Sequence, residues 1–124
     1  MIGSYAFVLA TVLLTVFGQI VIKWQVLKAG SIPEAPDLKL HFLLQLLFNP
    51  WIISALAAAF LASITWMAAM TKLPLSHGYP LTSLSFVLIL LLAHLFFGEA
   101  ITPLKVAGMA FIILGIVLIG ISNG

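Results

Sequence analysis

A stripe of polar side chains runs along the first apolar segment of the chain. Thr11, Thr15, Gln19 and Lys23 recur every four residues, so they share one side of a helix, with Gly18 beside them. An amide and an ammonium group within an apolar segment are costly against lipid and are expected to face protein or water. The stripe therefore predicts the wall of an internal cavity. The alternative is that the hydroxyls bond to carbonyls of their own helix and that the lysine extends to the membrane surface.

A second polar cluster surrounds a break in a later apolar segment. Pro80 has no N–H for the carbonyl of Ser76, and Gly78 loosens the same turn. A broken helix is tolerated in a membrane where its freed backbone groups face protein or a wet cavity, and such breaks mark many transporter sites. The alternative is a static kink whose freed carbonyl bonds to a hydroxyl. The polar residues around the break are Ser76, His77, Tyr79, Thr82, Ser83 and Ser85.

Few other side chains could carry chemistry. His77 and His94 would lie about 25 Å apart along one helix, so they cannot share a metal ion within one chain. The chain has no cysteine, and it shows no nucleophile–base pair, metal-ligand cluster or phosphate-binding loop. We therefore predict no catalytic residue, no metal, no cofactor and no enzymatic activity. Glu99, in a Gly-Glu turn, is either a solvated acid or a partner for Lys105 or a cationic headgroup.

The composition indicates a membrane protein. Of 124 residues, 64% are hydrophobic and only 6% are charged, and the mean hydropathy is +1.30. These few polar residues cannot cover the surface of a soluble domain. A net charge of +2 without any arginine gives no indication of nucleic-acid binding. The apolar N-terminus follows no lysine or arginine and is too long for the core of a signal peptide, so we predict that it is a transmembrane helix.

Four segments are long enough to cross a bilayer, which takes about 20 residues. The first is uncharged from Ile2 to Ile22 and is expected to continue to about Lys28. The others are predicted at residues 51–70, 75–97 and 103–121. The pairs Asn49-Pro50 and Thr102-Pro103 each place a proline at the start of a helix, and Asn49 is a good N-cap.

Residues 38–48 are apolar but too short to span the bilayer, and they predict an interfacial helix between the first and second spans. The alternative is an N-terminal extension of the second span. We therefore predict an all-α membrane protein, with residues 1–124 forming a single domain of four transmembrane helices.

The lysines favour one orientation. Lys28, Lys39 and Lys105 flank loops on one side of the predicted bundle, whereas only Lys72 lies on the other. The positive-inside rule then places both termini outside the cytoplasm, although so small a bias leaves dual topology open.

The last predicted helix carries paired glycines. Gly108 and Gly115 are one heptad apart and lie on nearly the same side of the helix. Small residues allow membrane helices to approach closely. We predict a dimer contact here, because four helices alone enclose little cavity; packing within the monomer is the alternative.

These motifs resemble known transporters. The C-terminal segment FFGEAITPLKVAGMAFIILGIVLIG is similar to the end of an EamA-type repeat of the drug/metabolite transporter superfamily. Its part from Gly108 to Val117 resembles the dimerisation motif of small multidrug resistance transporters, which are antiparallel dimers of four-helix subunits. In that family a glutamate eight positions before the helix-1 lysine and a tryptophan on helix 3 bind cations. Those positions hold Thr15 and Thr82 here, which argues against export of drugs or guanidinium.

A closer resemblance is to the paired small subunits of the flippase for undecaprenyl-phosphate-linked 4-amino-4-deoxy-L-arabinose. It covers all four spans and fails mainly at residues 31–48. The shared features are Gly18-Gln19 followed by Lys23, the Tyr79-Pro80 break, Ser83-Leu84, Phe86-Val87, Glu99, Thr102-Pro103 and the glycine segment of the last helix.

This resemblance implies a flippase in the bacterial inner membrane for a polyprenyl-phosphate-linked sugar or a similar amphipathic anion, working as a homodimer or heterodimer. Gly78 and Pro80 would form a conformational break. Alternatives are a proton-coupled exporter that uses His77, His94 or Glu99, and an accessory subunit without a transport path. The implied substrate-binding residues are Lys23, Gln19, Thr15, Tyr79, Thr82, Ser83 and Glu99.

Overall fold

The computed structural model describes residues 2–122 and is entirely helical over that range. Four stretches are long and apolar enough to cross a membrane: α1, α3, α4 together with α5, and α6. The prediction of a multi-pass helical protein with a short helix between its first two spans is confirmed. The helices are α1 (Ile2–Ala29), α2 (Pro36–Leu47), α3 (Pro50–Met70), α4 (Leu75–Leu81), α5 (Leu84–Phe97) and α6 (Pro103–Ile121).

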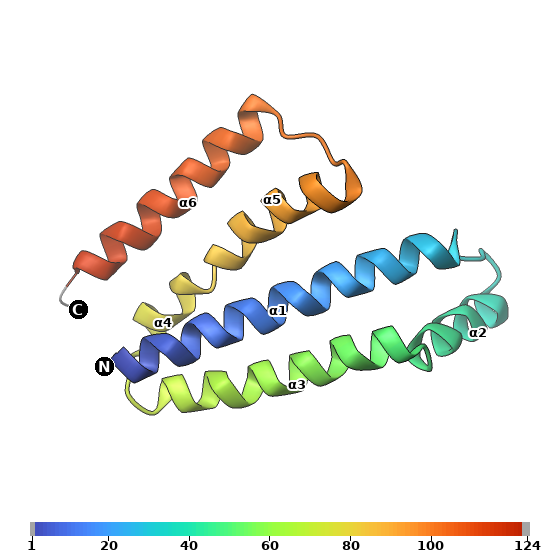
Figure 1. Cartoon of the computed structure of the whole chain (residues 1–124), viewed down its shortest axis with the longest axis horizontal. Coiled ribbons are helices and arrows are strands. Elements are labelled where there is room, and N and C mark those ends of the chain that lie inside the picture. Colours follow the sequence, from blue (N-terminus) through green and yellow to red (C-terminus); the bar gives the residue numbers. More distant parts are fainter. Residues whose placement is uncertain (1, 123–124) are drawn as a thin grey trace.

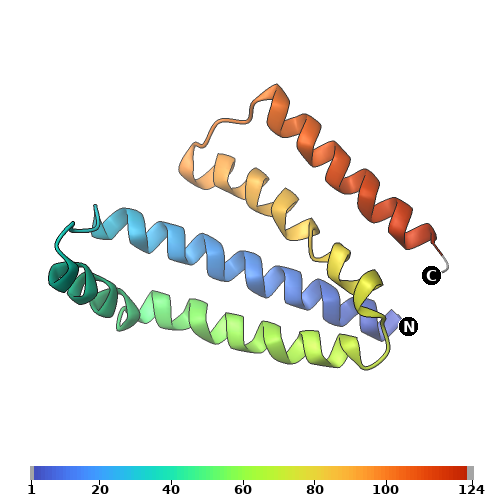
Figure 2. The same ribbon diagram turned by 180° about the vertical axis from the view of Figure 1, so that it is seen from behind.

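The antiparallel pair of α1 and α3 forms the packed centre of the molecule, with α4 and α5 on the other side of α1 (Figures 1 and 2). Small residues make this packing close. A Cβ atom added to Gly18 would lie 3.3 Å from the carbonyl oxygen of Ala55. Ala55, Ala58 and Ala62 are buried in α3. Small side chains of this kind let two membrane helices gain van der Waals contact along their length.

The far end of α1 is joined to the start of α3 by polar and aromatic contacts. The side chain of Asn49 caps α3 by accepting a hydrogen bond from the N–H of Trp51 (2.8 Å), as predicted. The same side chain donates through Nδ2 to Oε1 of the buried Gln25 (3.1 Å). The rings of Trp24 and Trp51 meet edge to face at 5.0 Å. These contacts hold the part of α1 that carries Lys23.

The short helix α2 begins at Pro36 and ends at Leu47, separately from α3. None of its described residues is buried. It lies beyond the end of the α1–α3 pair (Figure 1). Its position at the membrane surface remains a prediction.

The third span is interrupted later than the sequence suggested. Gly78 and Pro80 both lie inside α4, and regular helix stops at Thr82 and Ser83 before α5 begins. The N–H groups of Thr82 and Ser83 bond to carbonyls three residues back rather than four. A proline in a helix removes one bond and crowds the carbonyl four residues earlier, and here the helix re-forms only a turn later.

The helix α6 lies at the outside of the molecule, beyond α4 and α5 (Figures 1 and 2). Thr102 caps it by accepting a hydrogen bond from the N–H of Lys105 (3.2 Å). None of its described residues is buried. Added Cβ atoms at Gly108 and Gly115 would meet no other atom within 4 Å. The paired glycines therefore face away from the rest of the chain.

We expect Gly18→Leu to weaken the α1–α3 packing, because the new side chain must displace the Ala55 backbone. Overpacking of this kind costs about 1–3 kcal/mol. The measurement is the free energy of unfolding in mixed micelles. Gly3→Leu on the same helix is the control, since an added Cβ there meets nothing within 4 Å. Equal stability of the two variants would contradict this account of the packing.

Candidate functional site

A pocket with a mainly apolar wall and several polar side chains lies between α1 and α5 near the end of α1. Its volume is about 460 Å³. It brings together Lys23, Gln19 and Thr15 of α1 and Glu99 of the turn after α5. We call this the Lys23 pocket. Its remaining wall consists of Ile20, Ser85, Phe86, Ile89, Ala93 and Phe97.

The Lys23 pocket holds one positive and one negative side chain. Lys23 and Glu99 are both exposed, so each is free to reach a ligand in the pocket. The turn that carries Glu99 is well fixed. Gly98 adopts a left-handed conformation (φ 66°), and a ring nitrogen of His94, Nδ1, shares a hydrogen bond with the carbonyl oxygen of Glu99 (2.8 Å). Lys105 donates its Nζ to the carbonyl of Ala100 (2.8 Å) and does not line the pocket.

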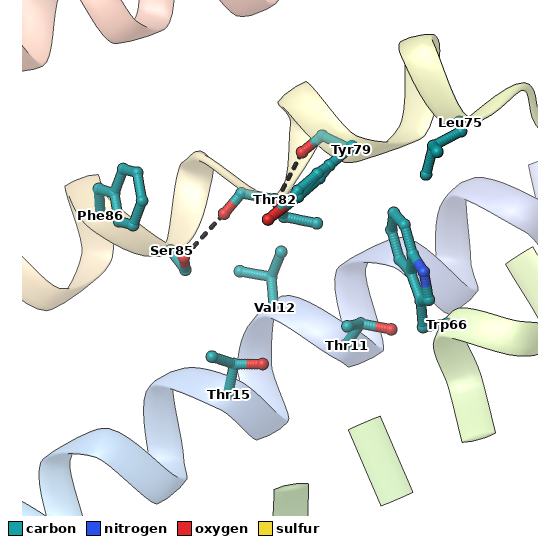
Figure 3. Close-up of a pocket in the computed structure, with 9 residues that line it drawn as sticks. All are labelled: Thr11, Val12, Thr15, Trp66, Leu75, Tyr79, Thr82, Ser85 and Phe86. Atoms are coloured by element: carbon teal, nitrogen blue, oxygen red, sulfur yellow. Dashed lines mark hydrogen bonds between the residues drawn. The ribbon is translucent and has the colours of Figure 1, made fainter. Parts of the chain in front are cut away.

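A second pocket lies further toward the start of α1, at the break between α4 and α5 (Figure 3). Its volume is about 580 Å³. The rings of Trp66 from α3 and Tyr79 from α4 meet there edge to face, with centroids 6.1 Å apart. We call it the aromatic pocket. It shares three residues with the Lys23 pocket and so adjoins it: Thr15, Ser85 and Phe86.

The polar stripe of α1 is divided between these environments. Four residues turn an α-helix by about 400°, so the stripe drifts about 40° at each step. Thr11 therefore lies in the contact with α3, where its hydroxyl is 2.7 Å from that of Thr65. Thr15 lines both pockets, whereas Gln19 and Lys23 reach only the Lys23 pocket of these two.

The hydroxyls at the break give two backbone carbonyls a second hydrogen bond beside the one that each accepts from an N–H group. Thr82 donates its hydroxyl to the carbonyl of Tyr79 (2.5 Å), and Ser85 donates to the carbonyl of Thr82 (2.7 Å; Figure 3). This arrangement lets non-helical backbone lie inside an apolar segment. Ser83 faces a neighbouring hollow of about 750 Å³ that also includes Tyr79 and Thr82.

The sequence reasoning did not include Trp66. It lies in an alanine-rich segment of α3, and the sequence does not show which neighbouring helix a single tryptophan there contacts. Gly78 makes room for the Met70 side chain beside it: a Cβ at Gly78 would lie 2.7 Å from Cε of Met70 and, in ordinary contact, 3.6 Å from the Trp66 ring. Gly78 thus allows α4 to approach α3 closely.

The two predicted histidine sites lie outside both pockets. Nε2 of His77 hydrogen-bonds the hydroxyl of Tyr5 (2.8 Å), tying the start of α1 to α4. His94 bonds the turn beside Glu99, as described above. Across residues 2–122 there is no group of three side chains suited to hold a metal ion.

Comparison with known families identifies the chain. Residues 1–121 match the model of the EamA-like transporter family. The chain belongs to this family. EamA-like proteins are transporters, so the prediction of a membrane transporter rather than an enzyme is confirmed.

Individual relatives are similar over nearly all of this chain and most of their own length. A protein of Aeromonas salmonicida named as a probable 4-amino-4-deoxy-L-arabinose-phosphoundecaprenol flippase subunit ArnF is 35% identical, over 97% of this chain and 80% of its own. A probable ArnE subunit of the same flippase from Yersinia pseudotuberculosis is 36% identical, over 94% of this chain and 95% of its own. No solved structure matches the chain.

We expect Pro80→Ala to make the third span more regular, because alanine restores an N–H for the carbonyl of Ser76. A proline inside a helix costs about 3 kcal/mol or more, so the variant should be the more stable protein. Hydrogen exchange at residues 81–86 should slow. Pro103→Ala is the control, since a proline at the first turn of α6 breaks no helical bond. Unchanged exchange in Pro80→Ala would show that the interruption has another cause.

Proposed function

We propose that the chain is a subunit of a flippase that moves a polyprenyl-phosphate-linked amino sugar across the bacterial inner membrane. The observation that carries this proposal is the Lys23 pocket, where an ammonium and a carboxylate line one cavity with an amide and hydroxyls. A sugar phosphate bearing an amine has the complementary charges. The relatives' names agree with this chemistry, since they describe flippase subunits for 4-amino-4-deoxy-L-arabinose-phosphoundecaprenol.

In this proposal Lys23 binds the phosphate, and Glu99 binds the amine of the same headgroup. Charge-assisted hydrogen bonds of this kind are stronger than neutral ones. Gln19 and Thr15 offer hydrogen bonds to the sugar between them. The pocket is lined by α1, α5 and the following turn, and α6 contributes no residue to its wall. Because α6 does not close the pocket, the polyprenyl tail can stay in lipid on that side while the headgroup is bound.

The path continues from the Lys23 pocket into the aromatic pocket. Their shared wall lets a headgroup pass from one half of the bundle to the other. With the orientation favoured by the lysines, the Lys23 pocket lies in the cytoplasmic half. Tyr79, Thr82 and Ser83 would bind the sugar in the other half. The interruption that follows Pro80 would let α4 move relative to α5, with Gly78 as the point of close approach.

We expect Lys23→Met to reduce flipping at least about tenfold while the protein stays folded, because a hydrogen bond to a charged group contributes about 1.5–3 kcal/mol. The assay follows the amino-sugar lipid across proteoliposomes that contain the chain and any partner subunit. Lys28→Met is the matched control. Lys28 lies over the ring of Trp24, 4.7 Å from its centroid, and does not line the pocket. Flipping by Lys23→Met at the wild-type rate would refute the role of Lys23.

We also propose that the chain works as a dimer, with a second copy or with a similar small subunit, through α6. This helix has no buried residue among those described, and Gly108 and Gly115 face open space. A transport-competent pathway would then be completed by the partner. If the chain were only an accessory subunit, it would move no lipid by itself even as a homodimer.

We expect Gly108→Leu and Gly115→Leu to weaken dimer formation at least several-fold without lowering monomer stability, because each new side chain blocks close helix approach. Association is measured by energy transfer between labelled subunits in liposomes. Gly120→Leu is the control, as Gly120 is also unobstructed but lies about 120° around the helix from Gly108. If both variants associated as fully as wild type, this surface of α6 would be excluded as the dimer contact.

A further inference from the structure

We propose that Trp66 and Tyr79 form a second subsite for the headgroup, which takes the protonated amine of the sugar against the faces of the two rings. The ligand class rests on the proposed function, in that it is the amino-sugar lipid. The subsite itself rests on the aromatic pocket, which brings together one residue from α3 and one from α4.

The two rings are arranged as two walls of a corner. Their planes are inclined by 68° and their centroids are 6.1 Å apart. Figure 3 shows both rings bordering the space above Thr11 and Val12 of α1. A cation within about 6 Å of a ring centroid is attracted by the negative face of the ring, and tryptophan gives the strongest attraction. A group placed in the corner can contact both rings.

The other polar groups of the aromatic pocket favour a hydrogen-bond donor. The pocket's wall contains no charged side chain. Thr82 and Ser85 donate their hydroxyl protons to backbone carbonyls, so their oxygens present lone pairs to the pocket. An ammonium group has three protons to donate and no lone pair. An anion would find no positively charged side chain in this wall, and the negative faces of the two rings repel it. The pocket thus suits the amine of the headgroup and not its phosphate.

This subsite is separate from the Lys23 pocket. Thr11 in the aromatic pocket and Lys23 are about 18 Å apart along α1. A single sugar phosphate does not reach from one to the other, so the two pockets are successive positions of the headgroup. In the first the amine meets Glu99, and in the second it meets the two rings. The second position therefore replaces a carboxylate by aromatic faces, which hold a cation without a buried charge.

The test compares binding of two lipids to the wild-type protein and its variants in nanodiscs, with any partner subunit present. One lipid is the polyprenyl-phosphate amino sugar and the other is the same lipid with its amine N-acetylated. We expect wild type to prefer the amine. Tyr79→Leu should reduce that preference about two- to thirty-fold, and Trp66→Phe should reduce it less. Tyr79 is 57% exposed, so its replacement removes little packing. Phe60→Leu on α3, which is 68% exposed and lies outside the pocket, is the control.

Two results would overturn the subsite. One is that Tyr79→Leu keeps the wild-type preference for the amine. The other is that it loses affinity for both lipids in equal proportion, because the pocket would then recognise shape and not charge. A Lys23→Met protein should instead lose affinity for both lipids, since both keep the phosphate.

A second measurement separates this subsite from the proposed function. A protein with Trp24→Phe and Trp51→Phe retains Trp66 as its single tryptophan. Its fluorescence should respond to a water-soluble methyl glycoside of the amino sugar and not to the neutral methyl arabinoside, and Tyr79→Leu should abolish the response. A response without lipid flipping would leave the subsite standing and refute the flippase. Lipid flipping without any fluorescence response, or an equal response to both glycosides, would refute the subsite. The proposed flippase function would then still stand.

Discussion

The close packing of α1 against α3 is the contact on which the rest of the structure depends. Membrane helices gain no hydrophobic free energy from meeting each other, so they associate through van der Waals contact and hydrogen bonds. Gly18 against Ala55 provides the first, and the hydroxyls of Thr11 and Thr65 provide the second. Together they fix the rotation of α1. Once that rotation is fixed, Lys23 must lie on the side of α1 that faces α5.

A membrane also requires that each backbone polar group finds a partner within the protein. The third span meets this requirement at its interruption by using the hydroxyls of Thr82 and Ser85 as extra donors. The static kink with hydroxyl partners and the wet cavity at a broken helix were stated as alternatives. In this structure the hydroxyls of Thr82 and Ser85 bond to the carbonyls of Tyr79 and Thr82, and both residues also line the aromatic pocket.

The chain presents two different kinds of surface. Around α1 the helices pack closely and border pockets that contain polar side chains, whereas α6 stands outside with no buried residue among those described. A helix in that position can contact lipid or another subunit, and two glycines on one side favour another helix. The site and the proposed dimer contact are therefore on separate elements, so each can be altered without changing the other.

The sequence by itself determined the spans, because apolar length and proline caps depend only on neighbouring residues. The starts of α3 at Asn49-Pro50 and of α6 at Thr102-Pro103 follow from such local rules. It also placed Thr15, Gln19 and Lys23 on one side of α1, since helical periodicity is local. The tertiary structure alone decided that Glu99 joins Lys23 and that Trp66 joins Tyr79, because the two members of each pair come from different elements of the fold. The first pairing depends on how α1 is rotated against α3, and the second depends on how α4 packs against α3. No local pattern encodes either arrangement.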